Sequence, residues 1–384
     1  MNEHINFHTL MQYGSVADNV LEICESFSIV AERVGSANCQ EVASLSCYHG
    51  NECPRIEFSL TAEGQKEPFY TSHSYIIGKE DEYTLQSWRV PPLFLPGMTL
   101  RINIDVPKGT TLKIRNFTTD HTASIRDWNG GPRYNAHLGF WGLAPDNTIP
   151  AFELAAVCGF PACIVVPKVT RDGILVCIHD DTINRTARDE NGNAPPDPIY
   201  VWDKNYDELL KWEYGSYKNQ IYKGVKIPLL SDFFDLCAKT GMRPMFSTHP
   251  GLTVEQWKQV KEMLAARGLL KKFHIKSFDI SVLKTAYEVF GTEIDGYTYD
   301  VLSWRNNIID TVLNIGIDAN SCRVGIEVRF DDYTEQIAKS ICDAGMFASA
   351  WDIERRDFSE YERLFSMGVT EFTEDHHCSM GLNY

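Results

Sequence analysis

Eight short apolar runs alternate with amphipathic segments beyond Tyr134 of this 384-residue chain. The apolar runs lie at 134–137, 162–166, 243–248, 272–276, 294–299, 324–328, 346–351 and 368–373. Helical periodicity is present at 148–157, 230–239, 253–266, 280–289, 333–344 and 360–367. Short apolar strands that alternate with helices are typical of a parallel sheet, and eight of them predict an α/β fold, a (β/α)8 TIM barrel. The run 174–178 predicts one extra strand, joined to the second by the turn 171–173.

The first 126 residues carry a different pattern, in which apolar residues alternate with polar ones. Such alternation over 100–106 and 112–114, with the turn 107–110 between, predicts a hairpin with one buried face. Short runs rich in aromatic and β-branched residues precede it at 27–34, 55–61, 69–77 and 83–90. We therefore expect an all-β sandwich over 1–126 that precedes the barrel at 134–384. The breaker-rich segment 127–133 is the predicted linker.

Charge and composition narrow the class of partner. The formal net charge is −16, which argues against nucleic acid or an anionic membrane as the main partner. No apolar run approaches the roughly 18–20 residues of a membrane span. Since the first residues lack the basic and apolar regions of a signal peptide, and no Cys-x-x-Cys pair is present among eleven cysteines, we expect a cytoplasmic protein with reduced thiols.

Short motifs in a fixed order follow the first predicted barrel strand. They read Ala136-His137-Leu138-Gly139, Pro145-Asp146-Asn147-Thr148, Thr170-Arg171-Asp172-Gly173 and Ile178-His179-Asp180-Asp181-Thr182. This order resembles the glycerophosphodiester phosphodiesterase family, whose domain opens with His-Arg-Gly, Pro-Glu-Asn-Thr, a Glu-x-Asp strand, Thr-Lys-Asp-Gly and a strand that ends in His-Asp. The resemblance runs over residues 134–377. It implies a barrel that cleaves phosphodiesters, with His137 and His179 as acid and base at the mouth formed by the carboxyl ends of the strands.

The chain departs from the family at the positions that bind metal. The family's Glu and Asp ligands fall on Ile164 and Val166, and its third-strand Glu-x-Lys falls near Ser247-Thr248-His249. Ca²⁺ and Mg²⁺ require several oxygen ligands, which Ile164, Val166 and Thr248 do not supply as carboxylates. We therefore expect no divalent cation and no other cofactor. A zinc site of His137, His179 and His249 is the open alternative.

Four further residues are candidates for binding a phosphate-ester ligand: Lys168, His249, Asp180 and Trp351. By period-2 alternation we expect Lys168 to share a strand face with Ile164 and Val166. Its ammonium then offers a point charge in place of the metal, or simply solvates the end of its strand. His249 stands near the family's lysine, or is a loop histidine before a proline. Asp180 either orients an imidazole or belongs to a turn. Trp351 either lines the site or packs at the barrel rim.

Two functions follow. The first is an enzyme that hydrolyses a phosphoric diester, or cyclises it through a substrate hydroxyl, with His137 and His179 and without the metal site. The second is a catalytically inactive barrel that binds a phosphorylated or sugar ligand, with the β-sandwich as a carbohydrate- or partner-binding module. Turnover of a simple diester separates the two.

Overall fold

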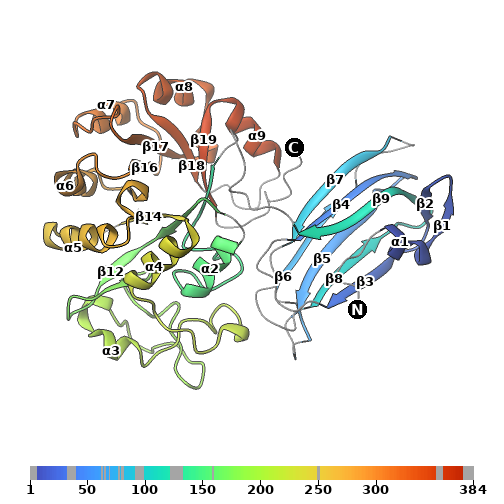
Figure 1. The fold of residues 1–384 in the computed structure, drawn as a ribbon, viewed down its shortest axis with the longest axis horizontal. Helices are drawn as coiled ribbons and strands as arrows, with labels where there is room; N and C mark the ends of the chain where they lie inside the picture. Colours follow the sequence, from blue (N-terminus) through green and yellow to red (C-terminus); the bar gives the residue numbers. More distant parts are fainter. Residues whose placement is uncertain are drawn as a thin grey trace. The chain divides into compact units, whose positions relative to one another are not determined.

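Two compact units make up the chain, one within Met1–Ser124 and one within Ile125–Cys378 (Figure 1). The computed structural model describes residues 7–32, 40–61, 64, 66–68, 70–76, 78, 82–90, 99–121, 133–157, 160–248, 251–351 and 358–374. The predicted linker 127–133 lies outside these residues, except for Arg133.

The first unit consists of two antiparallel sheets, after a short helix α1 (Phe7–Leu10) and a 3-10 turn η1 (Met11–Tyr13). The first sheet has the order β1 (Ser15–Ala17), β2 (Val20–Ile23), β9 (Thr111–His121), β4 (Gln40–His49) and β7 (Thr84–Val90). The second has the order β3 (Phe27–Glu32), β8 (Thr99–Asp105), β5 (Arg55–Thr61) and β6 (Tyr70–Tyr75). Each sheet buries one face, as Leu100, Ile102 and Ile104 of β8 show. The predicted all-β domain is confirmed.

The predicted hairpin between 100–106 and 112–114 is wrong. Strand β8 pairs with β3 and β5, whereas β9 pairs with β2 and β4, so the turn at 107–110 connects two different sheets. Alternation identified the buried face of each strand correctly, since Leu112 and Ile114 are buried like Ile102. A buried face does not determine which strand is the neighbour, because consecutive strands of a sandwich either pair or cross between the sheets.

The second unit is a closed barrel of eight parallel strands, as predicted. In barrel order the strands are β10 (Arg133–Ala136), β11 (Ala162–Val165), β14 (Arg243–Ser247), β15 (His274–Ser277), β16 (Gly296–Val301), β17 (Arg323–Arg329), β18 (Phe347–Trp351) and β19 (Val369–Glu374). The extra strand is confirmed as β13 (Leu175–Cys177), which forms an antiparallel pair with β12 (Pro167–Val169). Val166 separates β11 from β12.

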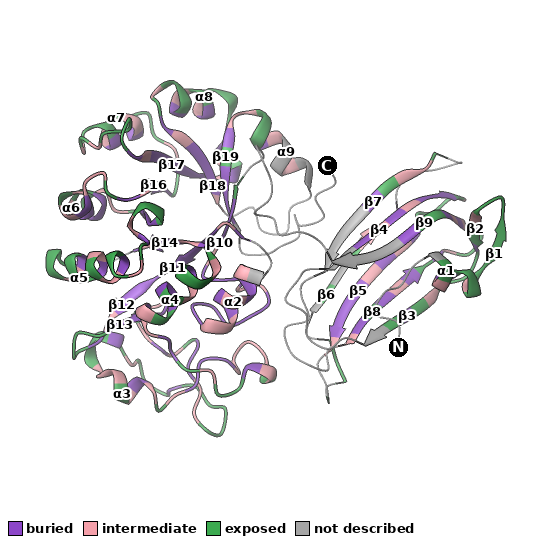
Figure 2. Ribbon diagram, viewed as in Figure 1, coloured by how far each residue is buried: buried purple, intermediate pink, exposed green. Residues whose placement is uncertain are grey.

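Helices surround the barrel and bury one face against it. They are α2 (Ile149–Val157), α4 (Leu230–Thr240), α5 (Val254–Ala265), α6 (Ile280–Phe290), α7 (Ile308–Leu313), α8 (Glu335–Asp343) and α9 (Phe358–Ser366). Helix α5 shows the pattern: Trp257, Val260 and Leu264 are buried, and the opposite face is exposed (Figure 2). Its N-terminus is capped by Thr253, whose hydroxyl accepts from the Gln256 N–H. The six-residue helix α7 had not been predicted.

A long connection leaves the barrel between β13 and α4. It contains η3 (Val201–Asp203), α3 (Tyr206–Leu209) and η4 (Gln220–Tyr222) and is otherwise irregular. The connection has an apolar core of its own, in which Ile183, Val201 and Leu209 are buried. This core holds an irregular segment in a defined conformation beside the carboxyl ends of β10 and β11.

The barrel interior contains a buried layer of polar side chains. Lys276 Nζ bonds to a Glu327 carboxylate oxygen, lies 3.0 Å from Thr373 Oγ1 and lies 3.7 Å from Asp300 Oδ1. Ser349 donates to Glu327 at 2.7 Å. These five side chains come from the five strands β15 to β19, so that one ion-paired layer joins the second half of the barrel. In the part of the chain that the structure describes, Asp300 has no hydrogen-bond partner for either carboxyl oxygen.

Two further observations concern the whole described chain. All eight cysteines within it are free thiols. None of the helices in the described ranges has the length and apolar character needed to cross a membrane.

Candidate active site

The loop after β10 carries the first histidine in a constrained backbone. His137 is partly buried, and the next two residues have positive φ, 54° at Leu138 and 83° at Gly139. A Cβ atom on Gly139 would lie 2.6 Å from Ala151 Cβ, so only glycine allows the loop to approach the start of α2 this closely. Phe140 N–H donates to Ala151 O at 2.9 Å and fixes that approach. These contacts hold the backbone next to His137 against the start of α2.

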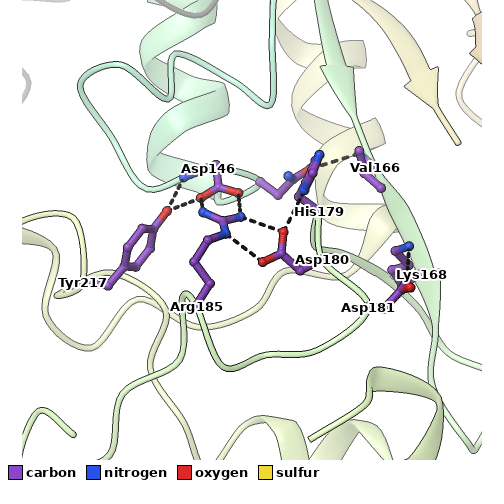
Figure 3. A network of polar contacts seen from close by, with 9 residues as sticks. Asp146, Val166, Lys168, His179, Asp180, Asp181, Arg185 and Tyr217 are labelled. Carbon is purple, nitrogen blue, oxygen red and sulfur yellow. Dashed lines mark hydrogen bonds and ion pairs between the residues drawn. The ribbon is translucent and has the colours of Figure 1, made fainter. Parts of the chain in front are cut away.

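The second motif ties this loop to the neighbouring strand. Asn147 also has positive φ, 53°, and its N–H donates to Leu138 O at 2.9 Å. Its side-chain Oδ1 accepts from the Val166 N–H at 3.0 Å (Figure 3). Asparagine is one of the few residues that adopt this conformation at low cost. It connects the His137 loop to the carboxyl end of β11.

The second histidine reaches the same end of the barrel from the β12–β13 hairpin. Ile178 N–H donates to Val166 O at 3.0 Å, which places the hairpin's exit beside the end of β11. Because β10 and β11 are adjacent and parallel, His137 and His179 both stand at the carboxyl face, where the active sites of such barrels lie. The His179 side chain is half exposed, and its Nδ1 lies 2.7 Å from Asp180 Oδ1.

A chain of charged groups holds Asp180 in place (Figure 3). Arg185 donates to both Asp180 oxygens, with Nε at 2.7 Å from Oδ2, and its other edge donates to both oxygens of Asp146 at 2.9 and 3.1 Å. The Tyr217 hydroxyl also donates to Asp146. The guanidinium thus joins the second motif to the fourth through two carboxylates.

These contacts determine the protonation states. Burial disfavours the Asp146 carboxylate, but the hydrogen bonds and charge of Arg185 outweigh burial and lower the pKa of Asp146. Burial acts against Asp180 in the same way, and hydrogen bonds from His179 and Arg185 lower the pKa of Asp180 far below its usual value. Both carboxylates are therefore anionic near neutral pH, and His179 always has an anionic acceptor at Nδ1.

Lys168 and Asp181 form a separate pair. Only 7% of the Lys168 side chain is exposed, and its Nζ lies 2.5 Å from Asp181 Oδ1. Lys168 belongs to β12, which pairs with β13 and not with the barrel, so it does not continue the face of Ile164. A phosphate would share this ammonium with Asp181.

The positions that correspond to the family's metal ligands are apolar or neutral. Ile164 is fully buried in an apolar cluster with Ala162 and Met245. Val166 has 6% exposure and offers only backbone groups, which Asn147 and Ile178 occupy. Within the described residues, no three His, Cys, Asp or Glu side chains gather as a metal site would require. These residues do not fit a hard divalent cation.

The remaining predicted residue at the rim is Trp351, at the end of β18. Its Nε1 donates to Val301 O at 3.3 Å, and its ring packs edge-on against Phe278, with ring centroids 5.8 Å apart. His249 lies outside the described residues.

Sequence reasoning missed Tyr217 as a member of the site. It lies 71 residues from Asp146 in an irregular connection with no motif around it, so only the folded structure brings the two together.

The barrel unit is similar in sequence to known proteins. Residues 137–292 match the glycerophosphoryl diester phosphodiesterase family. A glycerophosphodiester phosphodiesterase of Caldanaerobacter subterraneus is 29% identical over 133 residues, which cover 33% of this chain and 51% of that protein. One of Bacillus altitudinis is 29% identical over 150 residues, which cover 36% and 57%. The chain thus spans about half the length of these curated relatives.

Solved structures show the same fold. A phosphodiesterase of Oleispira antarctica, in complex with the product sn-glycerol-3-phosphate, superposes with a TM-score of 0.56 at 23% identity, over 65% of this chain and 95% of that one. A glycerophosphodiester phosphodiesterase of Agrobacterium tumefaciens superposes with a TM-score of 0.52 at 16% identity, over 65% and 99%.

Proposed function

Since the barrel of this chain belongs to the glycerophosphodiester phosphodiesterase family, we propose that it cleaves a phosphoric diester with His137 and His179 as the acid–base pair. The observation that carries the proposal is the hydrogen-bonded chain from His179 through Asp180 and Arg185 to Asp146. A histidine whose Nδ1 is held by an anchored carboxylate keeps Nε2 directed at a substrate, as a general acid or base must.

The proposed reaction is a displacement at phosphorus. One imidazole takes a proton from the attacking water as its oxygen bonds to phosphorus. The other imidazole gives a proton to the alcohol oxygen as the P–O bond to the leaving group breaks, so that a phosphomonoester and an alcohol result. If a hydroxyl of the substrate attacks instead of water, the product is a cyclic phosphate, and the proton transfers are the same.

We further propose that this reaction does not depend on the divalent cation of the family. Ile164 and Val166 offer no carboxylate at two of its ligand positions, and the apolar cluster around Ile164 would disfavour an ion there. The charge of the phosphoryl oxygens must then be met by cationic side chains and backbone N–H groups at the mouth.

Turnover of bis(p-nitrophenyl) phosphate and of glycerophosphocholine tests the proposal, each with and without a chelator and with metal analysis of the purified protein. We expect hydrolysis that the chelator leaves unchanged. Hydrolysis that the chelator abolishes, together with a stoichiometric divalent ion, would overturn the metal-independent part. No hydrolysis of either diester, with ligand binding retained, would instead make the barrel a binding module.

A further inference from the structure

Arg185 and Lys168, the two cations tied to the His179 motif, are both engaged by carboxylates. Arg185 shares its donors between Asp146 and Asp180, and Lys168 is paired with Asp181. A substrate anion would have to share either cation with the carboxylates that already neutralise it. A phosphoric diester nevertheless carries a negative charge, so the site needs another cation.

Lys218 is such a cation. It follows Tyr217, whose hydroxyl bonds to Asp146 (Figure 3). The β13–α4 connection thereby brings Lys218 to the loops of the site. Its Nζ lies 5.0 Å from the ring centroid of Trp141, four residues after His137. Lys218 and Trp141 are both partly buried.

The Lys218 ammonium has unused hydrogen-bonding capacity. In the ranges that the structure describes, its Nζ makes no hydrogen bond and no ion pair, and its contact with Trp141 is with the ring face. A cation–π contact leaves the three N–H donors open. Burial lowers the pKa of Lys218, Asp146 acts in the opposite direction, and Arg185 lowers it further. An ammonium that has lost part of its water and is in direct contact with no carboxylate gains more from a bound anion than an exposed lysine does.

We infer that Lys218 and Trp141 form an anion-binding subsite of the mouth, in which the ammonium takes an anionic oxygen of the ligand and the indole forms an apolar wall. The inference rests on the proposed function for its substrate class. The anionic oxygen belongs either to the scissile phosphoryl group or to an acidic group on the alcohol part of the diester. The ligand chemistry is the same in both cases, and the test separates them.

The test compares Lys218→Met with Lys223→Met in the full-length protein. Methionine keeps an apolar stem over Trp141 and removes the charge, and Lys223 is an exposed lysine of the same connection. Binding of inorganic phosphate and of sn-glycerol-3-phosphate is measured by calorimetry, and KM and kcat are measured for glycerophosphocholine and glycerophosphoserine. Thermal melting checks that each variant is folded.

A subsite for the phosphoryl group predicts that Lys218→Met raises Kd for inorganic phosphate about tenfold, while Lys223→Met leaves it unchanged and Lys218→Arg largely restores it. A subsite for an acidic headgroup predicts unchanged phosphate binding and a KM for glycerophosphoserine that rises about tenfold relative to glycerophosphocholine. Either result supports the subsite. Equal Kd and KM values for Lys218→Met and Lys223→Met with every ligand and substrate would overturn the subsite. Turnover that persists in that case leaves the proposed function standing, and Lys218-dependent phosphate binding without turnover removes the function but not the subsite.

Discussion

Replacement of Arg185 by methionine should destabilise the barrel by an amount that its contacts define. The variant loses two hydrogen bonds to Asp146, whose side chain is 2% exposed, and leaves that carboxylate with Tyr217 as its remaining hydrogen-bond partner in the described part of the chain. Removal of one partner from a buried ion pair costs about 3–5 kcal/mol. Since Arg185 is 43% exposed, the low end applies, and we expect a loss of about 3 kcal/mol in the free energy of unfolding.

A second substitution, Asp146→Asn, separates the uncompensated charge from the lost hydrogen bonds. Because the double variant Arg185→Met/Asp146→Asn has no buried charge, its free energy of unfolding should be only about 1 kcal/mol below that of the wild type. Catalysis should not recover, because Asp180 still lacks the guanidinium that holds it against His179, and kcat should stay about 10–100-fold low in both variants.

Urea unfolding followed by tryptophan fluorescence is the suitable assay, because Trp88 is the only one of eight tryptophans that precedes the barrel unit. The pKa of Asp146 is lowered in the folded protein, so the ion pair contributes above the unfolded pKa near 3.8 and its contribution is lost as pH falls through the lower, folded pKa. The difference in free energy of unfolding between Arg185→Met and the wild type should therefore become smaller at acidic pH. A deficit below about 1 kcal/mol at neutral pH, or a double variant less stable than Arg185→Met, would refute the reasoning.

Three further predictions concern the site and the barrel interior. His137→Gln and His179→Gln should each lower kcat about 100-fold or more, measured as diester turnover, and wild-type turnover in either would end the acid–base assignment. Burial raises the pKa of Asp300 well above its usual value. Asp300 therefore lowers the stability of the folded protein more and more as pH rises from the unfolded pKa towards the folded pKa. Asp300→Asn should accordingly gain in Tm relative to the wild type as pH increases from 5 to 9, and a gain that shrinks over this range would contradict that assignment. Ile164→Glu combined with Val166→Asp should create affinity for Ca²⁺ in calorimetric titration, with some loss of stability from the buried charges; no heat in a variant that melts as a folded protein would show that other groups exclude the ion.

The barrel was predictable from sequence because its strands are buried on both faces. Runs such as 162–166 and 346–351 are nearly continuous in apolar or small residues, and helices of clear periodicity separate them. The strand pairing of the sandwich was harder to predict from the sequence. Strand β4, which pairs with both β7 and β9, contains Ser44 and Ser46 among its buried residues and a register shift after Leu45, so its alternation is weak.

The site was predictable only where motifs are local. His137 and His179 were proposed because each ends a strand in a recognisable order. Of the two interpretations given for Asp180, its contact with His179 Nδ1 fits the one in which it orients an imidazole. Tyr217 and Lys218 carry no local signal, since the β13–α4 connection folds around its own small core. Lys168 was assigned to the face of Ile164 by counting along one strand, and the break at Val166 separates the two.

The closed barrel cannot form during translation before its last strand, β19, has been synthesised. Among the barrel strands β19 is the last to leave the ribosome, and its Glu371 accepts hydrogen bonds from Asn135 of the first strand and from Arg323 of the sixth. Its Thr373 contacts Lys276 of the fourth strand. Until β19 is synthesised, these polar groups of the interior lack a hydrogen-bond partner. The edges of β10 and β18 are then open to pairing with other chains. The nascent barrel should therefore need protection by chaperones until β19 has been synthesised, and chains stalled before residue 369 should be degraded by proteases at sites throughout the barrel.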